Sequence, residues 1–370
     1  MPSTREITER VLSGKGVYYH TDDTFYIDES QIGRPIWDDR SERIVGFIGG
    51  YLVPMISTIQ PNYETIFYVV NQVRNYLTGF GANPSLTLFV DRLDQLLRGS
   101  SLLVPDCQGG IDWSLERLSD VTLDYISDIV WRTLARRSGP TAYLKTVVDA
   151  CSDNDFDGVY LFTLNHDCVL ERHLAESGIV CIDGYVKGEF FDRWDPRVFD
   201  TRDTVYLLKL HGSIDCFQMN VYSGDERTWV LGRPKFTSIN QVIDDQSRID
   251  LASGRPELLV GTENKLHDYL GSHFLYLHSK FYQMLENVDR LLVCGYGFRD
   301  TGINTRVYDW LWQRHERKLC IIHDAPDELI ANAAGLLPHR LREWRDRGQA
   351  VFVSRRIEDT SWAEIKQALV

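Results

Sequence analysis

The chain has 370 residues, 43% of them hydrophobic and 25% charged, which is ordinary for a globular protein with one large or two smaller domains. Its net charge of −13, from 40 basic and 53 acidic residues, disfavours direct binding of nucleic acid, because an acidic surface repels polyanions. The sequence has no apolar run of membrane length and no signal peptide, so we expect a cytoplasmic protein without membrane contact. Its seven cysteines include no C-x-x-C zinc pair, so we expect reduced thiols and no metal.

The beginning of the chain is expected to form an N-terminal arm, because residues 1–40 place aromatic side chains on a polar background. Residues 41–370 are then expected to form a single domain. Its first buried strand is predicted at Val45–Ile48, an apolar run that ends in Gly49 and Gly50.

Residues from about 60 to 150 show helical periodicity. In Leu86–Leu97 and Leu115–Leu134, apolar residues recur three and four positions apart, as on one face of an amphipathic helix. Such stripes must pack against other apolar surface. We therefore predict a helical subdomain inserted after the first strand.

Five further apolar runs end abruptly in polar residues or glycine. They are Val159–Leu164, Val205–Leu210, Arg290–Cys294, Lys318–Ile322 and Ala350–Val353. Runs of this length are typical of strands buried on both faces, and helical patterns such as Asp167–Ser177 and Phe274–Asn287 lie between them. This alternation predicts an α/β fold with a Rossmann-like, doubly wound parallel sheet. The polar stretch Asp215–Arg255 is expected to form a long excursion or a small hairpin.

The ends of these runs are the predicted site, because open parallel sheets bind ligands outside the carboxyl ends of their strands. Reactive side chains gather there, namely Asn165, Asp167, His211, Ser213, Asn304 and Asp324. Neighbouring glycines allow backbone N–H groups to approach a phosphate. A purely structural role stays open for three of these features. Asp167 could cap a helix, His211 could be a packed histidine, and Gly295–Gly297 could form a tight turn.

Three of these strand ends resemble a known family. FTLNHD (162–167), KLHGS (209–213) and GYGFRDTGIN (295–304) resemble the signature motifs of sirtuin-like domains, especially those of bacterial anti-phage systems. PELLVGTENK (256–265) resembles a further, weaker block. The motifs stand in the family's order, and the resemblance identifies 41–370 as a sirtuin-like catalytic domain with a helical insertion at about 60–150.

The resemblance implies that NAD is the substrate, with Asn165 and His211 as the catalytic pair. The residue matching Asn165 binds the nicotinamide ribose and places the attacking water, and the one matching His211 is the general base. The implied NAD-binding residues are Gly49, Gly50, Thr163, Asp167, Gly212, Ser213, Gly295, Tyr296, Gly297 and Asn304.

The chemistry of NAD cleavage suits these residue types. Breaking the bond between ribose and nicotinamide passes through an oxocarbenium-like state, as in glycoside cleavage. The leaving group is already cationic, so no strong acid is needed. An amide such as that of Asn165 both donates and accepts hydrogen bonds, and a histidine suits proton removal near neutral pH.

The chain departs from the family pattern in two places. Sirtuin-like domains open with a G-A-G-x-S turn, whereas this chain has FIGGYLVPM (47–55), with Tyr51 and Val53 at the expected third glycine and serine. This difference bears on NAD affinity. The chain also lacks the paired cysteines that hold the zinc of protein-deacylating sirtuins, which favours water as the acceptor.

The sequence therefore predicts an NAD hydrolase that releases nicotinamide and ADP-ribose and depletes NAD in abortive anti-phage defence. Such an activity needs a gate, so the resemblance implies a homo-oligomer and a HerA-type ATPase as partner. Two alternatives stay open. The chain could be a non-catalytic module that binds NAD or ADP-ribose and regulates a partner, or an NAD-dependent protein deacylase or ADP-ribosyl transferase.

Overall fold

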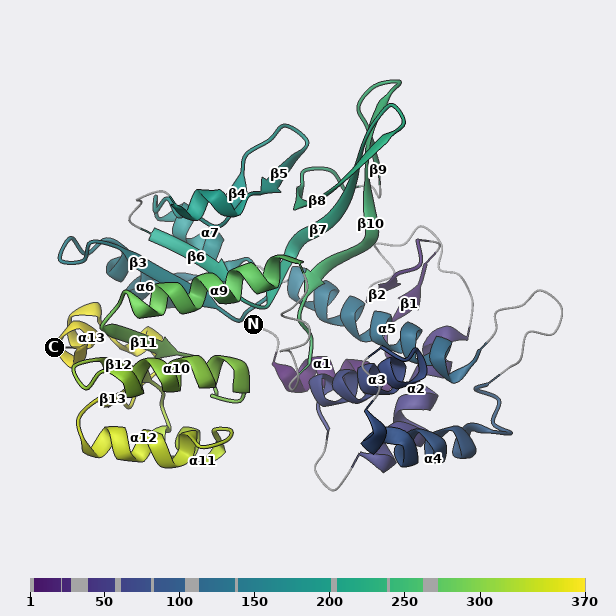
Figure 1. Cartoon of the computed structure of the whole chain (residues 1–370), viewed down its shortest axis with the longest axis horizontal. Coiled ribbons are helices and arrows are strands. Elements are labelled where there is room, and N and C mark those ends of the chain that lie inside the picture. Colours follow the sequence, from purple (N-terminus) through teal and green to yellow (C-terminus); the bar gives the residue numbers. More distant parts are fainter. Residues whose placement is uncertain are drawn as a thin grey trace. The chain divides into compact units, whose positions relative to one another are not determined.

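The chain combines helices with parallel and antiparallel strands and divides into two units. A computed structural model describes residues 3–20, 22–27, 39–56, 61–80, 83–103, 113–136, 139–200, 205–237, 240–261 and 272–369. Unit 1 comprises Met1–Arg137 and Asp250–Thr262, and unit 2 comprises Ser138–Ile249 and Glu263–Val370 (Figure 1). Within the described ranges, no helix is both long and apolar enough to cross a membrane.

Unit 1 is mainly helical. Its elements are α1 (Thr4–Ser13), β1 (Tyr18–Tyr19), β2 (Phe25–Tyr26), α2 (Arg40–Phe47), α3 (Tyr63–Leu77), α4 (Thr87–Leu97) and α5 (Leu115–Ala135). The helices predicted at Leu86–Leu97 and Leu115–Leu134 are confirmed as α4 and α5. Described residues of the expected N-terminal arm, including Val11 and Phe25, are buried in the apolar core of this unit.

The strand predicted at Val45–Ile48 is wrong. This segment closes α2 and enters a π-helical turn, Ile48–Leu52, that continues into a 3₁₀ turn, Val53–Met55. Ile44, Phe47 and Ile48 are fully buried in the core of unit 1, at the spacing of one helix face. A run of only four apolar residues cannot distinguish a strand from a buried helix, and here helical packing decides.

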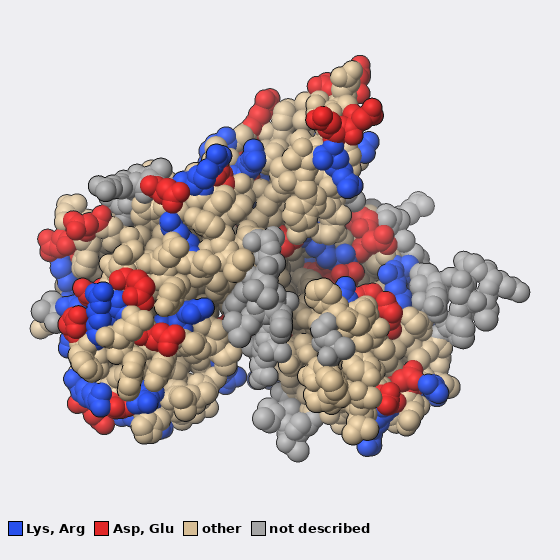
Figure 2. Space-filling model, in the orientation of Figure 1, with Lys and Arg blue, Asp and Glu red and all other residues tan. Residues whose placement is uncertain are grey.

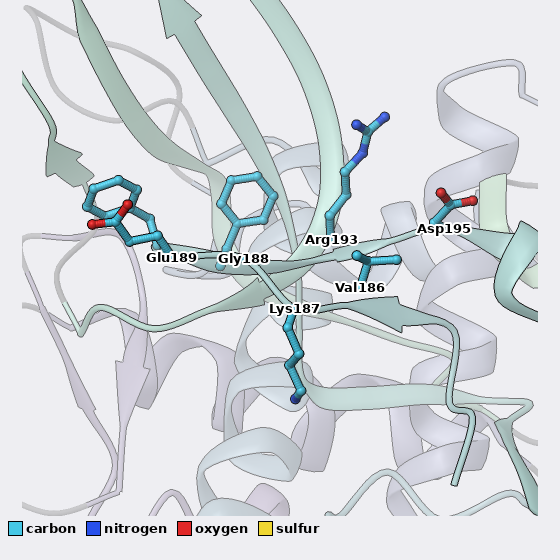
Figure 3. Close-up of a pocket in the computed structure, with 8 residues that line it drawn as sticks. Val186, Lys187, Gly188, Glu189, Arg193 and Asp195 are labelled. Carbon is cyan, nitrogen blue, oxygen red and sulfur yellow. The ribbon is translucent and has the colours of Figure 1, made fainter.

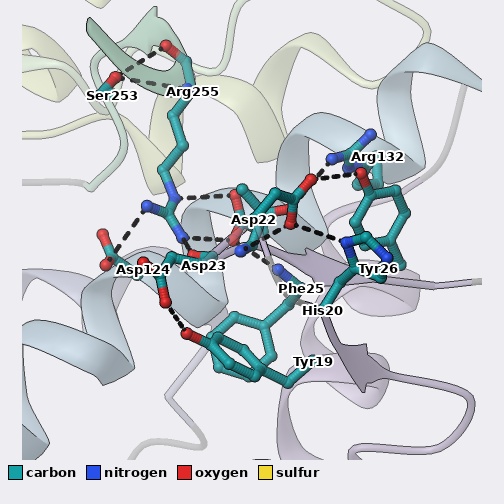
Figure 4. A network of polar contacts seen from close by, with 12 residues as sticks. Tyr19, His20, Asp22, Asp23, Phe25, Tyr26, Asp124, Arg132, Ser253 and Arg255 are labelled. Carbon is teal, nitrogen blue, oxygen red and sulfur yellow. Dashed lines mark hydrogen bonds and ion pairs between the residues drawn. The ribbon is translucent and has the colours of Figure 1, made fainter. Parts of the chain in front are cut away.

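A buried ion pair joins three segments of unit 1 (Figure 4). Asp128 of α5 has no exposed surface and accepts hydrogen bonds from Arg255 Nε at 2.9 Å and Nη2 at 2.8 Å. It also accepts the backbone N–H of Phe25 at 2.8 Å. Arg255 Nη1 lies 3.4 Å from the Asp124 carboxylate, and its Nη2 donates to the Asp23 carbonyl at 2.6 Å. These contacts hold β2 and Arg255, which belongs to the second segment of unit 1, against α5.

Unit 2 contains the parallel strands. β3 (Val159–Thr163) pairs with β6 (Val205–Lys209), and β11 (Arg290–Cys294), β12 (Lys318–Ile322) and β13 (Ala350–Val353) form a second parallel sheet in that order. These strands confirm the five predicted runs. In the described part of the chain they form two hydrogen-bonded sheets, where one sheet was expected.

Helices flank these strands in unit 2. They are α6 (Lys145–Cys151), α7 (Val169–Glu176), α9 (Ser272–Glu286), α10 (Thr301–Gln313), α11 (Pro326–Asn332), α12 (Leu337–Asp346) and α13 (Trp362–Leu369). α7 and α9 confirm the two helical patterns predicted between strands. Phe281 of α9 packs edge-on against Phe162 of β3, with ring centroids 4.6 Å apart, so α9 covers β3.

An antiparallel sheet contains the polar stretch 215–255, expected to form an excursion or a hairpin, together with two strands that precede it. Its strands are β4 (Tyr185–Val186), β5 (Phe191–Trp194), β7 (Gly212–Ser223), β8 (Glu226–Pro234), β9 (Asn240–Val242) and β10 (Ser247–Leu258), in the order β4-β5-β8-β7-β10-β9. β7 and β8 form a long hairpin that turns between Ser223 and Glu226. On the face shown in Figure 2, lysine and arginine side chains are interspersed with aspartate and glutamate.

Candidate functional site

The predicted catalytic residues lie in unit 2, at the carboxyl ends of neighbouring strands. β3 and β6 are parallel, so the turn after β3, which carries Asn165, lies beside the turn after β6, which carries His211. Backbone hydrogen bonds join the two turns. Leu210 N–H donates to the Thr163 carbonyl at 2.9 Å, and Ile214 N–H donates to the His166 carbonyl at 2.9 Å.

His211 faces a carboxylate. The imidazole is only 5% exposed, and its Nε2 lies 3.0 Å from Oδ2 of Asp300, whose side chain is also largely buried. The other oxygen, Asp300 Oδ1, accepts the Ile303 N–H at 3.1 Å and caps α10. The helix start therefore fixes the carboxylate. A fixed carboxylate orients a histidine and stabilises its protonated form, which is how a general base is prepared.

Two other histidines lie near His211. The ring centroid of His166 is 6.2 Å away, and His278 of α9 donates Nε2–H to the Leu210 carbonyl at 3.0 Å. Burial, with a further contribution from nearby His211, lowers the pKa of His278 to about 4. His278 is therefore neutral at physiological pH and holds the backbone just before His211.

Asn165 is exposed, and its backbone is held by the Thr163 side chain. Asn165 N–H donates to Thr163 Oγ1 at 3.1 Å. This contact gives Thr163 a positioning role and leaves the Asn165 amide at the surface of the turn. An exposed amide beside a buried histidine suits contact with a polar ligand.

Asp167 and Ser213 are bonded within the protein. Asp167 is buried, and its Oδ1 accepts the Val169 N–H at 2.9 Å, although Cys168 holds the N-cap position of α7. Ser213 donates to the carboxylate of Asp215, which pairs with Arg233 Nε at 3.0 Å. Burial alone would raise the pKa of Asp215, but Arg233 and Ser213 hold it below its usual value. Asp167 therefore bonds to the first turn of α7 without being its N-cap.

Residues 295–300 form a turn between β11 and α10, and Asn304 in the first turns of α10 bonds back to it. Tyr296 Oη lies 2.7 Å from Asn304 Oδ1, and Asn304 Nδ2 donates to the Phe298 carbonyl at 2.8 Å. Gly295 has a φ of 65° and Phe298 a φ of 50°, so the backbone curls back on itself here. Tyr296 and Asn304 thus hold the turn that presents Asp300.

A cavity of about 540 Å³ opens after β11 and β12, and Asn165, His211 and Asp300 are not among the residues that line it. It is lined by Gly297, Arg299, His323, Asp324, Ala325, Glu328, Leu329 and Asn332. Gly297 was a predicted ligand contact, and a side chain placed there would meet no atom within 4 Å. The cavity lies beside the turns after β11 and β12, where parallel sheets bind ligands.

A second cavity, of about 330 Å³, lies at the β4–β5 hairpin and includes none of the predicted site residues. Figure 3 shows the Lys187 side chain pointing away from Arg193. Lys187 Nζ pairs with Asp192 at 2.8 Å, so this cation is neutralised locally. We assign the candidate site to the strand ends.

Gly49 and Gly50 do not follow a strand. Both are exposed in the π-helical turn of unit 1, so the cluster described here, which consists of unit 2 residues, does not include them. Tyr51 and Val53 lie in the same helical segment.

Of the motif PELLVGTENK, positions 262–265 lie outside the described residues. Within the described ranges, no group of three or more histidine, cysteine or acidic residues is placed to hold a metal.

Sequence reasoning missed Asp300 and His278. Asp300 lies inside the GYGFRDTGIN motif, and its position just before a helix signals only a cap. Its contact with His211 depends on how β6 and β11 are placed in space.

No protein-family model matches the chain, and no curated protein matches it with significant similarity.

Proposed function

We propose that this chain is a sirtuin-like NAD hydrolase, which cleaves NAD to nicotinamide and ADP-ribose on a Rossmann-like fold. The observation that carries the proposal is the buried His211–Asp300 pair, 3.0 Å apart, beside the exposed Asn165. An isolated structural histidine needs no fixed carboxylate, whereas a general base gains orientation and charge stabilisation from one.

In the proposed mechanism, Asn165, His211 and Asp300 have separate roles. Asn165 hydrogen-bonds the ribose hydroxyls of the nicotinamide half and the attacking water. His211 removes a proton from that water as the ribose–nicotinamide bond breaks, and Asp300 stabilises the resulting imidazolium. The cavity at Gly297 offers a polar, partly enclosed space for the rest of the dinucleotide.

The proposed biological role is NAD depletion in anti-phage abortive infection, in the cytoplasm. It rests on the resemblance of FTLNHD, KLHGS and GYGFRDTGIN to the motifs of bacterial defence proteins. A homo-oligomer and a HerA-type ATPase are the proposed means of control, because unrestrained NAD cleavage would kill the cell.

A second candidate is a non-catalytic NAD- or ADP-ribose-binding module. The helical conformation of Ile48–Leu52 does not separate the two candidates, because the glycine turn expected in this segment would cradle the dinucleotide in either. The two functions differ in turnover. A binding module would show NAD binding by calorimetry without nicotinamide release.

One incubation separates the candidates. The purified chain is mixed with NAD, with and without an acyl-lysine peptide, and nicotinamide and ADP-ribose are measured by chromatography. We expect equal amounts of both products without the peptide. Release only with the peptide would identify a deacylase, and binding without release would identify a binding module.

The Asp300→Asn variant should lose about 100-fold in kcat, as expected for weakening a general base, with KM changed by less than a factor of about three. Asparagine keeps the shape and can still cap α10, but it lacks the charge that stabilises protonated His211. Steady-state kinetics and thermal unfolding measure the two effects separately. Asp200→Asn, at an exposed carboxylate, is the control. An Asp300→Asn enzyme with wild-type kcat would exclude a catalytic His211–Asp300 pair.

A further inference from the structure

Lys209 is a buried charge that the proposed reaction does not use. It is the last residue of β6, two positions before His211, and only 8% of it is exposed. The other four residues of β6 are tyrosine or aliphatic and are buried as well. An apolar side chain would therefore fill this position at less desolvation cost than an ammonium group.

The Lys209 ammonium reaches across to the turn after β3. Nζ donates to the carbonyl oxygens of His166, at 3.3 Å, and of Asp167. It also pairs with Glu171 Oε1 of α7 at 2.7 Å. Nζ thus contacts three oxygens, two through hydrogen bonds and one as an ion pair, and it also lies 4.0 Å from Cys168 Sγ. Two of the three are backbone atoms of the turn that begins with Asn165.

A role in positioning the neighbouring turn explains the buried Lys209–Glu171 pair better than a gain in folding stability does. A buried ion pair adds little net stability, because desolvation offsets the attraction between the charges. What the three contacts do supply is a fixed distance between the end of β6 and the carbonyls of residues 166 and 167. Backbone hydrogen bonds also join these segments, from Leu210 N–H to the Thr163 carbonyl and from Ile214 N–H to the His166 carbonyl, each at 2.9 Å.

We infer that Lys209 is a positioning residue, which holds the Asn165–Asp167 turn in register with the strand that carries His211. Glu171 lies against the ammonium as its counter-charge. The kinetic consequence rests on the proposed NAD hydrolysis. The structural consequence, a less protected turn when Lys209 is removed, does not depend on it.

The test compares wild type with Lys209→Met, Lys209→Arg and the double variant Lys209→Met/Glu171→Gln. The double variant removes the clamp without leaving an unpaired buried carboxylate, so it separates positioning from folding. Lys145→Met, which breaks an exposed ion pair on α6, is the matched control. Each protein is measured by hydrogen–deuterium exchange, thermal unfolding and steady-state release of nicotinamide.

In the double variant, we expect the Ile214 amide to exchange at least about tenfold faster, because its acceptor lies in the released turn. We also expect kcat to fall by about 10- to 100-fold with little change in KM, since misplacing a reacting group by about 1 Å costs about that much. Lys209→Arg should recover part of the rate, and Lys145→Met should match wild type.

Wild-type exchange of Ile214 in the double variant would overturn the inference. So would a kcat that falls only in proportion to the unfolded fraction, because Lys209 would then serve folding alone. If wild type releases no nicotinamide, the proposed function fails, and the exchange measurement still decides whether Lys209 holds the turn.

Discussion

Replacing His211 with alanine is expected to lower kcat for nicotinamide release by about 1,000-fold, within the range for removal of a general base. The loss should fall on kcat, because His211 is buried beside Asp300 and, in the proposed mechanism, acts on the attacking water more than on ground-state binding. The measurement is steady-state release of nicotinamide by purified wild type and variant.

His315→Ala is the matched control, because His315 is exposed on the connection between α10 and β12. It should retain the wild-type rate. A His211→Ala protein that is folded and as active as wild type would remove His211 from the mechanism. A loss of rate that parallels a loss of folded protein would assign it a structural role.

Replacing Arg255 with methionine is expected to lower the free energy of unfolding by about 3 kcal/mol at pH 8, as typically follows removal of one partner from a buried ion pair. Arg255 makes two hydrogen bonds to Asp128, which has no exposed surface. Methionine would leave that carboxylate charged and unpaired. Urea unfolding followed by tryptophan fluorescence measures the loss.

The size of this loss should depend on pH. Burial raises the pKa of Asp128 to about 6, even though Arg255 acts to lower it. A carboxyl group whose pKa is higher in the folded than in the unfolded state stabilises the fold at low pH, and this contribution disappears as pH rises through about 6. Without Arg255 the ionised form is costlier still, so Arg255→Met should lose less stability at pH 5 than at pH 8.

The double variant Arg255→Met/Asp128→Asn is the control for this interpretation. Asparagine keeps an acceptor for the Phe25 N–H and carries no charge, so it should recover much of the stability at pH 8. An equal loss at both pH values, or no recovery in the double variant, would show that the charge of Asp128 is not what Arg255 balances.

The parallel strands could be predicted from sequence because burial on both faces leaves a continuous apolar run. Val205–Lys209 illustrates both the strength and the limit of that pattern. All five residues are buried, as predicted for a central strand, yet the purpose of the lysine at its end was not foreseen. Its acceptors are backbone carbonyls of another turn, which no sequence pattern marks.

The site was predicted only in part, for a similar reason. Asn165 and His211 follow strands that pair in parallel, so their turns could be expected to meet. The role of Asp300 depends on tertiary placement of a helix cap against a histidine 89 positions earlier, counted from residue numbers 211 and 300. Asn304 was expected to face ligand, and its amide instead holds the backbone of Phe298.

The most direct test of NAD hydrolysis at this site is nicotinamide release by wild type beside Asn165→Ala, with Asn154→Ala as the control. Asn154 is an exposed asparagine of unit 2 that precedes β3. We predict that wild type and Asn154→Ala release nicotinamide and ADP-ribose in equal amounts, and that Asn165→Ala loses nearly all activity while remaining folded. Equal activity of wild type and Asn165→Ala, or binding of NAD by wild type without any release, would contradict it.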